Sequence, residues 1–120
     1  MQDAIFSISN EQDFNTQCIE VFHFQYRHVT VYRQYVDYLG KDPKAITHYK
    51  DIPFLPIEFF KTQPIIAQDK TDEIIFSSSG TTGMVSSKHL VADVNYYIAS
   101  FRRGFELFYG KPQDIAFLAL

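Results

Sequence analysis

The chain has 120 residues, of which 46% are hydrophobic, and this size and composition suit one globular domain. Its net charge of −3 argues against a nucleic-acid binder, its first residues do not resemble a signal peptide, and no run of about 18 apolar residues predicts a membrane span. Its one cysteine, Cys18, excludes an internal disulfide and favours a cytoplasmic location, where thiols stay reduced.

Residues 1–50 are expected to be helical. Asn10 or Ser9 can cap a first helix, on which the members of one buried face recur at helical spacing: Phe14, Cys18, Val21, Phe22, Gln25 and Val29. Thr30 is the expected N-cap of a second helix, which ends at Gly40 and whose buried face is predicted to consist of Val31, Tyr35, Tyr38 and Leu39. Because Cys18 lies on the first face, we interpret it as a buried structural thiol rather than a nucleophile.

Residues 51–120 contain shorter elements, which predict an α/β region. The segment 52–61 holds two prolines, and Pro56 could open a short helical turn. Strands are predicted next at residues 64–66, 73–76 and 88–92. Asp93 is expected to cap a helix that stops at Gly110 and has an apolar face formed by Val94, Ile98, Phe101, Phe105 and Phe108.

The last residues, 114–120, form an apolar run that is typical of a strand buried on both faces of a parallel sheet. Domains rarely end inside such a run, so we expect the chain to be the N-terminal part of a longer polypeptide. It would then be one incomplete domain, helical over residues 1–50 and α/β over residues 51–120. Self-association is also expected through this apolar strand, because an unpaired strand edge invites pairing.

A polar loop separates two of the predicted strands. Residues 77–83 consist only of serine, threonine and glycine. Glycine allows the backbone to approach a ligand closely, consecutive backbone N–H groups can surround an anion, and hydroxyl groups add further donors. The loop lacks the lysine and the following helix of a Walker phosphate loop. We therefore expect a phosphate-binding loop of another type, with a flexible Ser/Gly linker as the alternative.

Two segments carry a resemblance to known enzymes. Residues 78–83 together with Lys88 resemble the phosphate-binding signature of adenylate-forming enzymes, which include acyl-CoA synthetases, firefly luciferase and peptide-synthetase adenylation domains. Residues 52–61 resemble the Pro-x-x-Pro-x-x-x-Phe-Lys stretch of acyl-protein synthetases, the LuxE-like branch that activates fatty acids for bacterial bioluminescence. The resemblance spans residues 14–120, the beginning of such an enzyme. It departs from the usual superfamily spacing, because Lys88 lies five residues after Gly83 and no proline precedes it.

The resemblance implies the N-terminal part of an adenylate-forming large domain. Such an enzyme uses ATP and Mg²⁺ to convert a carboxylic acid, here expected to be a long-chain fatty acid, into an acyl adenylate, and passes the acyl group to a protein or to CoA. The residues expected to bind the phosphates of ATP are Ser78, Ser79, Gly80, Thr81, Thr82, Gly83 and Lys88. The family's catalytic residues and magnesium ligands lie further along the chain, so none is assigned here, and the fragment alone is expected to be inactive.

Other interpretations remain open. The chain could be a truncated, non-catalytic module that binds a nucleotide, an anion or a partner subunit, or the start of an enzyme like phenylacetate-CoA ligase. A phosphotransferase would need a magnesium-binding acid, and the sequence offers no convincing one: Asp69, Asp72 and Glu73 are interpreted as solvated loop charges. His89 adjoins the loop and could contact a phosphate, although an exposed strand histidine is the favoured interpretation.

Overall fold

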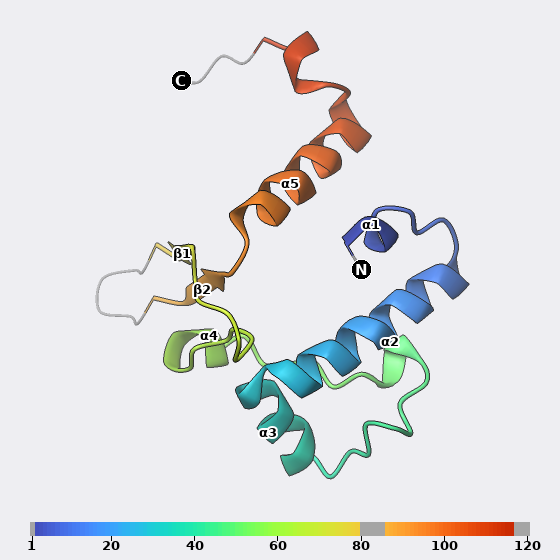
Figure 1. Cartoon of the computed structure of the whole chain (residues 1–120), viewed down its shortest axis with the longest axis vertical. Coiled ribbons are helices and arrows are strands. Elements are labelled where there is room, and N and C mark those ends of the chain that lie inside the picture. The colour runs from blue at the N-terminus through green and yellow to red at the C-terminus, as the bar shows by residue number, and fades with distance from the viewer. Residues whose placement is uncertain (1, 80–85, 117–120) are drawn as a thin grey trace.

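The computed structural model describes residues 2–79 and 86–116, which form an α/β arrangement of helices with one small sheet at its side (Figure 1). This confirms the predicted fold class. The elements, in chain order, are α1 (Gln2–Ile5), α2 (Glu11–His28), α3 (Thr30–Tyr38), η1 (Tyr49–Asp51), α4 (Phe59–Thr62), β1 (Ile74–Ser77), β2 (Lys88–Val91), α5 (Val94–Tyr109) and η2 (Pro112–Asp114). No helix among these residues is long and apolar enough to cross a membrane.

Helix α2 begins where the sequence predicts. The Asn10 side chain accepts a hydrogen bond of 2.9 Å from the backbone N–H of Asp13, so it satisfies one of the donors that a helix start leaves unpaired. Phe22 is fully packed on the inner face of this helix. Cys18, by contrast, is only partly buried, and the prediction of a buried thiol is wrong to that extent.

Helix α3 follows after a single extended residue, Val29, which ends α2 and also precedes the first turn of α3. Thr30 is therefore the first residue of α3, and the prediction that it caps the helix is wrong. Gly40 does end the helix region, with a φ of 65°, as predicted.

The buried face of α3 differs from the predicted one. The turn at Val29 directs positions 32 and 36 toward α2, so Tyr32 and Val36 are buried while Tyr38 remains 89% exposed. Among the described residues the core is small and consists of Phe22, Val29, Tyr32, Val36 and Ile46.

The connection from α3 to the sheet runs back along α2. Asn15 holds it there: its Oδ1 accepts a hydrogen bond of 2.8 Å from the N–H of Tyr49, and its Nδ2 donates one of 3.1 Å to the carbonyl of Thr47. Further on, the N–H of Gln68 donates to the carbonyl of His28 at 2.8 Å. These contacts hold residues 64–66 beside the end of α2 as irregular chain, so the strand predicted there is absent.

The sheet is an antiparallel hairpin of β1 and β2, as the two strands flanking the polar loop predict. In its register, Ile74 pairs with Val91, Phe76 with His89, and Ser77 with Lys88. The strands are shifted slightly from the predicted bounds, beginning at Ile74 and ending at Val91. The strand predicted at residues 114–120 lies mostly outside the described residues, and residues 115–116 are not strand.

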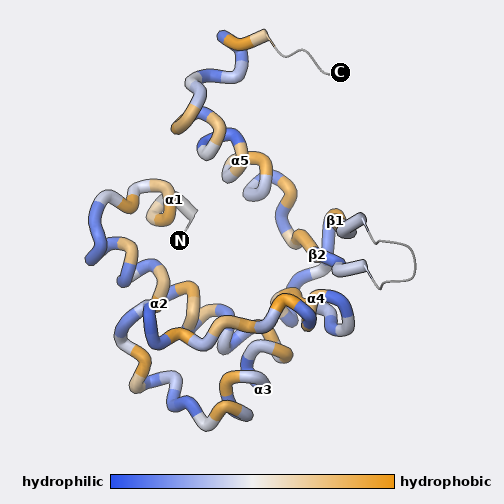
Figure 2. Tube along the Cα trace, turned by 180° about the vertical axis from the view of Figure 1, so that it is seen from behind, coloured by the Kyte–Doolittle hydropathy of each residue, from blue (hydrophilic) through white to orange (hydrophobic). Residues whose placement is uncertain are grey.

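Helix α5 leaves the hairpin and runs away from the α2–α3 pair (Figure 1). Asp93 caps it as predicted, because its Oδ1 accepts a hydrogen bond of 2.9 Å from the N–H of Tyr96. Glu73, interpreted from the sequence as a solvated loop charge, also accepts one of 2.8 Å from the N–H of Val94. Figure 2 shows hydrophobic residues along the whole helix. Phe6 links α5 back to the N-terminal region through contacts with Tyr96 and Arg103.

Candidate functional site

The two strands hold the ends of the predicted phosphate-binding loop together. Beyond the pair of Ser77 and Lys88, the N–H of Ser78 donates to the carbonyl of Ser87 at 3.1 Å. In return, the N–H of Ser87 donates to the hydroxyl of Ser78, also at 3.1 Å. We call Ser78, Ser79, Ser87 and Lys88 the loop base. Its geometry follows from the hairpin register, which brings together residues nine positions apart.

The loop base combines fixed and accessible groups. Ser87 is 8% exposed, whereas Ser78, Ser79 and Lys88 are exposed. The Ser78 oxygen accepts one hydrogen bond and keeps its own O–H as a donor for another partner. Three of the predicted phosphate-binding residues therefore lie at an open surface. The other four predicted residues lie outside the described residues: Gly80, Thr81, Thr82 and Gly83.

His89 connects the loop base to the proline-rich segment. Its Nε2 lies 3.3 Å from the hydroxyl of Ser87, and its ring stacks on the ring of Phe60 with centroids 4.9 Å apart. The predicted exposure of His89 is confirmed, but its partners could not be predicted, because Phe60 is far away in the sequence. Phe60 of the proline-rich segment thus meets the loop base through this histidine.

An open apolar cavity of about 990 Å³ lies between α2, the connection after α3, β2 and the start of α5. Its walls include side chains from each of these elements: Cys18, Val21, Phe60, Ile65, Val91 and Tyr96. Only two charged side chains of the described residues, Lys70 and Asp93, reach it. The cavity can therefore hold an apolar group but offers little to a highly charged one.

One polar atom of the cavity wall has no partner. The Oε1 of Gln17 is buried and accepts no hydrogen bond from any described residue. A buried acceptor without a donor costs free energy, so Gln17 is a polar exception in an otherwise apolar wall. Gln17 was not singled out by the sequence, because its neighbours on α2 gave no sign of a cavity.

Residues 3–103 match the family model described as acyl-protein synthetase, LuxE. The chain belongs to the acyl-protein synthetase family. No curated protein and no solved structure matches it significantly. An acyl-protein synthetase joins a carboxylic acid to a protein, so membership implies a carboxylic acid substrate and an acyl-acceptor protein. The resemblance drawn from the two segments is thereby confirmed at the level of this family.

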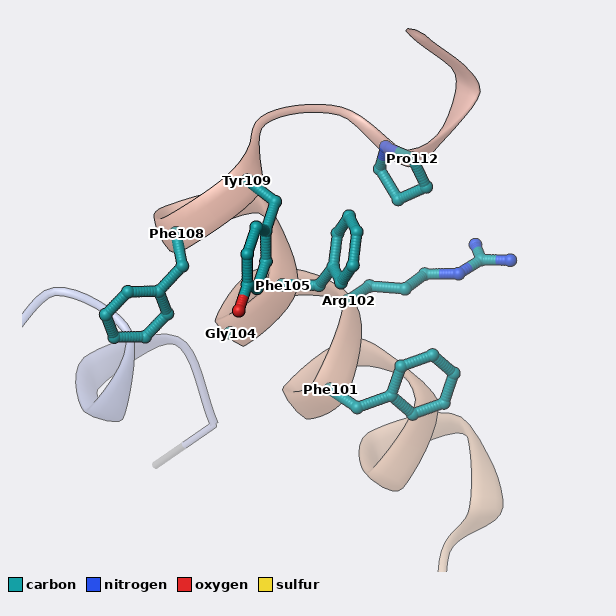
Figure 3. A pocket seen from close by; sticks show the side chains of 7 residues that line it. All are labelled: Phe101, Arg102, Gly104, Phe105, Phe108, Tyr109 and Pro112. Carbon is teal, nitrogen blue, oxygen red and sulfur yellow. The ribbon is translucent and has the colours of Figure 1, made fainter. Parts of the chain in front are cut away.

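A second hollow of this acyl-protein synthetase lies along the last turns of α5 and has a volume of about 570 Å³ (Figure 3). In Figure 3 the rings of Phe101 and Phe105 line it together with Pro112. Helix α5 confirms the helix predicted between Asp93 and Gly110. Its apolar face, however, is exposed to solvent: Phe101 is 53% exposed and Phe108 is 78% exposed. This hollow lies on the C-terminal half of α5. The loop base and β2 come before the N-terminus of α5 in the chain, so they are at the other end of that helix.

Metal-binding side chains in the described part of the chain do not gather at the loop base of this acyl-protein synthetase. Among the described residues, no group of three His, Cys, Asp or Glu side chains could hold a metal ion.

Burial raises the pKa of Tyr32 to about 12, with a smaller contribution from Tyr35. The Tyr32 hydroxyl donates a hydrogen bond of 2.7 Å to the carbonyl of Pro53, the first proline of the proline-rich segment. Tyr32 therefore fixes that segment against α3.

Proposed function

We propose that the chain is the phosphate-binding part of an ATP-dependent acyl-protein synthetase that activates a carboxylic acid as an acyl adenylate. One observation carries the proposal. The family match spans both the proline-rich segment and the hairpin, and the hairpin holds the loop base open to solvent. The cytoplasm is the proposed location, because the only cysteine is unpaired.

The proposed reaction has two half-steps. A carboxylate oxygen of the acid attacks the α-phosphorus of ATP, the bond from that phosphorus to the bridging oxygen breaks, and pyrophosphate leaves with the electron pair. The acyl adenylate then transfers its acyl group to a nucleophile of the acceptor protein, or to CoA as the alternative acceptor, and AMP is released.

The loop base is suited to the charge that develops on the leaving pyrophosphate. Hydroxyl donors of Ser78 and Ser79 and the ammonium of Lys88 are at the surface there. Donors that are already oriented where negative charge develops stabilise a transition state more than solvent does. Magnesium is an expectation from the family, and no described residue is assigned to it.

The apolar cavity is the proposed site for the hydrocarbon part of the acid. Its volume lies at the upper end of the range of about 300–1,000 Å³ for ligand pockets. Burial of each CH₂ group would contribute about 0.8 kcal/mol, so a long aliphatic chain binds better than a short one. Strand β2 connects the two proposed subsites, because it starts at Lys88 and its last residue, Val91, lines the cavity. We therefore favour a long-chain fatty acid over an aryl acid.

The test is carboxylate-dependent exchange of pyrophosphate into ATP by the protein encoded by the complete reading frame. Exchange with a long-chain fatty acid is expected, and Ser79→Ala and Lys88→Ala should each raise the KM for ATP about three- to tenfold, the effect of losing one hydrogen bond or charge contact. Lys111→Ala, an exposed lysine just before η2, is the matched control and should leave the KM unchanged.

Other outcomes separate the alternative functions. Absence of exchange with every fatty and aryl acid contradicts the proposal. Binding of ATP or pyrophosphate without exchange supports the non-catalytic module, and release of ADP instead of AMP supports a phosphotransferase.

A further inference from the structure

We propose that His89 is a positioning residue for the loop base and, through it, for the phosphates of ATP. This inference rests on the proposed function, and it assigns a role to a residue outside the predicted signature. Three observations on described residues carry it: the contact to Ser87, the stack on Phe60, and the position of His89 on β2 directly after Lys88.

The first contact acts on the least exposed residue of the loop base. Ser87 takes part in three hydrogen bonds: its N–H donates to the Ser78 hydroxyl, its carbonyl accepts from the Ser78 N–H, and its hydroxyl pairs with His89 Nε2. The first two bonds join Ser87 to Ser78, the residue that follows β1. The third joins it to the imidazole of His89 on β2, so Ser87 is held from both sides of the hairpin. A displacement of the His89 ring would release one of these constraints.

The second contact holds the ring itself. The Phe60 and His89 rings are nearly parallel, at an interplanar angle of 27°, and Phe60 belongs to α4. Phe76 lies opposite His89 in the hairpin register, so the two side chains share one face of the sheet. The Phe76 ring contacts the ring of Tyr97 of α5 in a tilted arrangement, with centroids 5.0 Å apart. The hairpin is therefore attached to α4 through His89 and to α5 through Phe76.

The consequence concerns preorganisation. Ser78, Ser79 and Lys88 are exposed, and binding a phosphate group requires them to be ordered. Ordering each side chain costs conformational entropy, which weakens binding unless the free protein has already restricted the group. An anchored Ser87 restricts both ends of the loop base before ATP arrives. Loss of the anchor should therefore weaken the binding of ATP and pyrophosphate and leave the binding of the acid unchanged.

Three variants separate the two contacts. His89→Phe keeps a ring for Phe60 and removes the nitrogen that faces Ser87. Ser87→Ala removes the hydroxyl and keeps both backbone bonds to Ser78. His89→Gln retains a polar group that can reach Ser87 and removes the ring. His23→Phe is the matched control, because it makes the same change in α2, away from the hairpin.

Three measurements report on the variants. Titration of the chain with inorganic pyrophosphate gives the Kd, and the exchange assay with the complete protein gives separate KM values for ATP and for the acid. Amide hydrogen exchange at Ser78 and Ser87 reports on the anchor in the absence of any ligand.

His89→Phe and Ser87→Ala are expected to weaken pyrophosphate binding about three- to tenfold, the effect of one neutral hydrogen bond, and to raise the KM for ATP without changing that for the acid. Their Ser78 and Ser87 amides should exchange faster. His89→Gln should restore part of the affinity, and His23→Phe should behave as the unmodified protein.

Two results would overturn the inference, and they differ from each other. Unchanged pyrophosphate affinity in both His89→Phe and Ser87→Ala, with unchanged amide exchange, shows that His89 is a surface residue, although the proposed function stands. If the unmodified protein binds neither ATP nor pyrophosphate, the proposed function fails and the inference fails with it. If His89→Phe does not fold, the result for Ser87→Ala decides whether the inference stands. This substitution removes only the hydroxyl oxygen of Ser87 and keeps the two hydrogen bonds that its backbone makes to Ser78.

Discussion

At the scale of single residues, Tyr32 shows how one buried side chain joins separate segments. It lies on the inner face of α3, only 8% exposed, and its hydroxyl donates to the carbonyl of Pro53, 21 positions further along the chain. Burial of the ring disfavours the phenolate, which is why the pKa of the hydroxyl is raised to about 12. Both facts lead to one prediction about stability.

Tyr32→Phe should lower the free energy of unfolding by about 1 kcal/mol at neutral pH, because the Pro53 carbonyl loses its donor. The difference from the unmodified protein should shrink as pH rises from 10 to 12. The reference pKa of a tyrosine is 10 and the folded value is about 12, so within this window the unfolded state has lost the proton that the folded state still holds. The stabilisation is complete below pH 10 and is lost toward pH 12. Urea unfolding at several pH values measures it.

Tyr38→Phe is the control, because Tyr38 is 89% exposed and has no part in the core. Its difference from the unmodified protein should stay near zero at neutral pH. A gap for Tyr32→Phe that stays constant or widens between pH 10 and 12 would contradict the role assigned to burial.

Single residues also show what the sequence could predict. The caps at Asn10 and Asp93 and the stop at Gly40 depend on a few neighbouring positions, and the structure confirms all three. Tyr32 and Val36 were missed because the buried face of α3 depends on the turn at Val29, which sets the direction of the helix relative to α2. Helix caps and stops could be predicted from neighbouring residues, whereas the orientation of one helix against another could not.

At the scale of elements, helix α5 starts with two carboxylates. Asp93 caps it in the usual way, and Glu73 reaches the first N–H from the residue before β1. The N-terminus of a helix carries a partial positive charge and unpaired N–H donors, so both carboxylates stabilise it. Because Glu73 also donates its N–H to the carbonyl of Val91, it joins β1, the end of β2 and α5.

Asp93→Ala should therefore destabilise the chain by about 1 kcal/mol, the usual effect of removing an N-cap. Glu73→Gln should cost less, because the amide oxygen still accepts a hydrogen bond but the charge at the helix end is lost. Thermal unfolding followed by circular dichroism measures both. Asp72→Asn is the matched control, since Asp72 is an exposed neighbour. Equal stability of Glu73→Gln and Asp72→Asn would mean that the charge of Glu73 contributes nothing.

Elements also differ in how far the sequence predicts them. The hairpin followed from two apolar segments on either side of a polar loop, which is a local pattern. Residues 64–66 are as apolar as those strands, but the contact between Gln68 and His28 holds them beside α2. The cavity and the meeting of Phe60 with His89 have no local signature at all, because each depends on elements that are distant in the sequence.

At the scale of the whole molecule, the arrangement is open. The accessible surface is 9182 Å², compared with about 6,700 Å² for a compact monomer of this mass. The radius of gyration is 17.1 Å, compared with about 14 Å for a compact domain of 120 residues. The difference arises because α5 leaves the hairpin away from the small core, as Figure 1 shows. The same separation of α5 from α2 produces the apolar cavity between them.

An apolar ligand that fills this cavity should therefore stabilise the whole arrangement, because it contacts α2, β2 and α5 at once. Dodecanoate at ten times its Kd should add about 1.4 kcal/mol by mass action and raise the melting temperature by about 6 °C. Hexanoate at the same concentration should have a smaller effect, since it buries fewer CH₂ groups.

Ala67→Trp places a large side chain in the cavity wall and should abolish the shift caused by dodecanoate. Ala45→Trp makes the same change at an exposed position outside the cavity and should leave that shift intact. Loss of the shift in both variants would indicate a detergent-like effect of the fatty acid. Its persistence in Ala67→Trp would place the acyl chain elsewhere on the molecule, with the open aromatic hollow of α5 as the next position to test by Phe105→Ala.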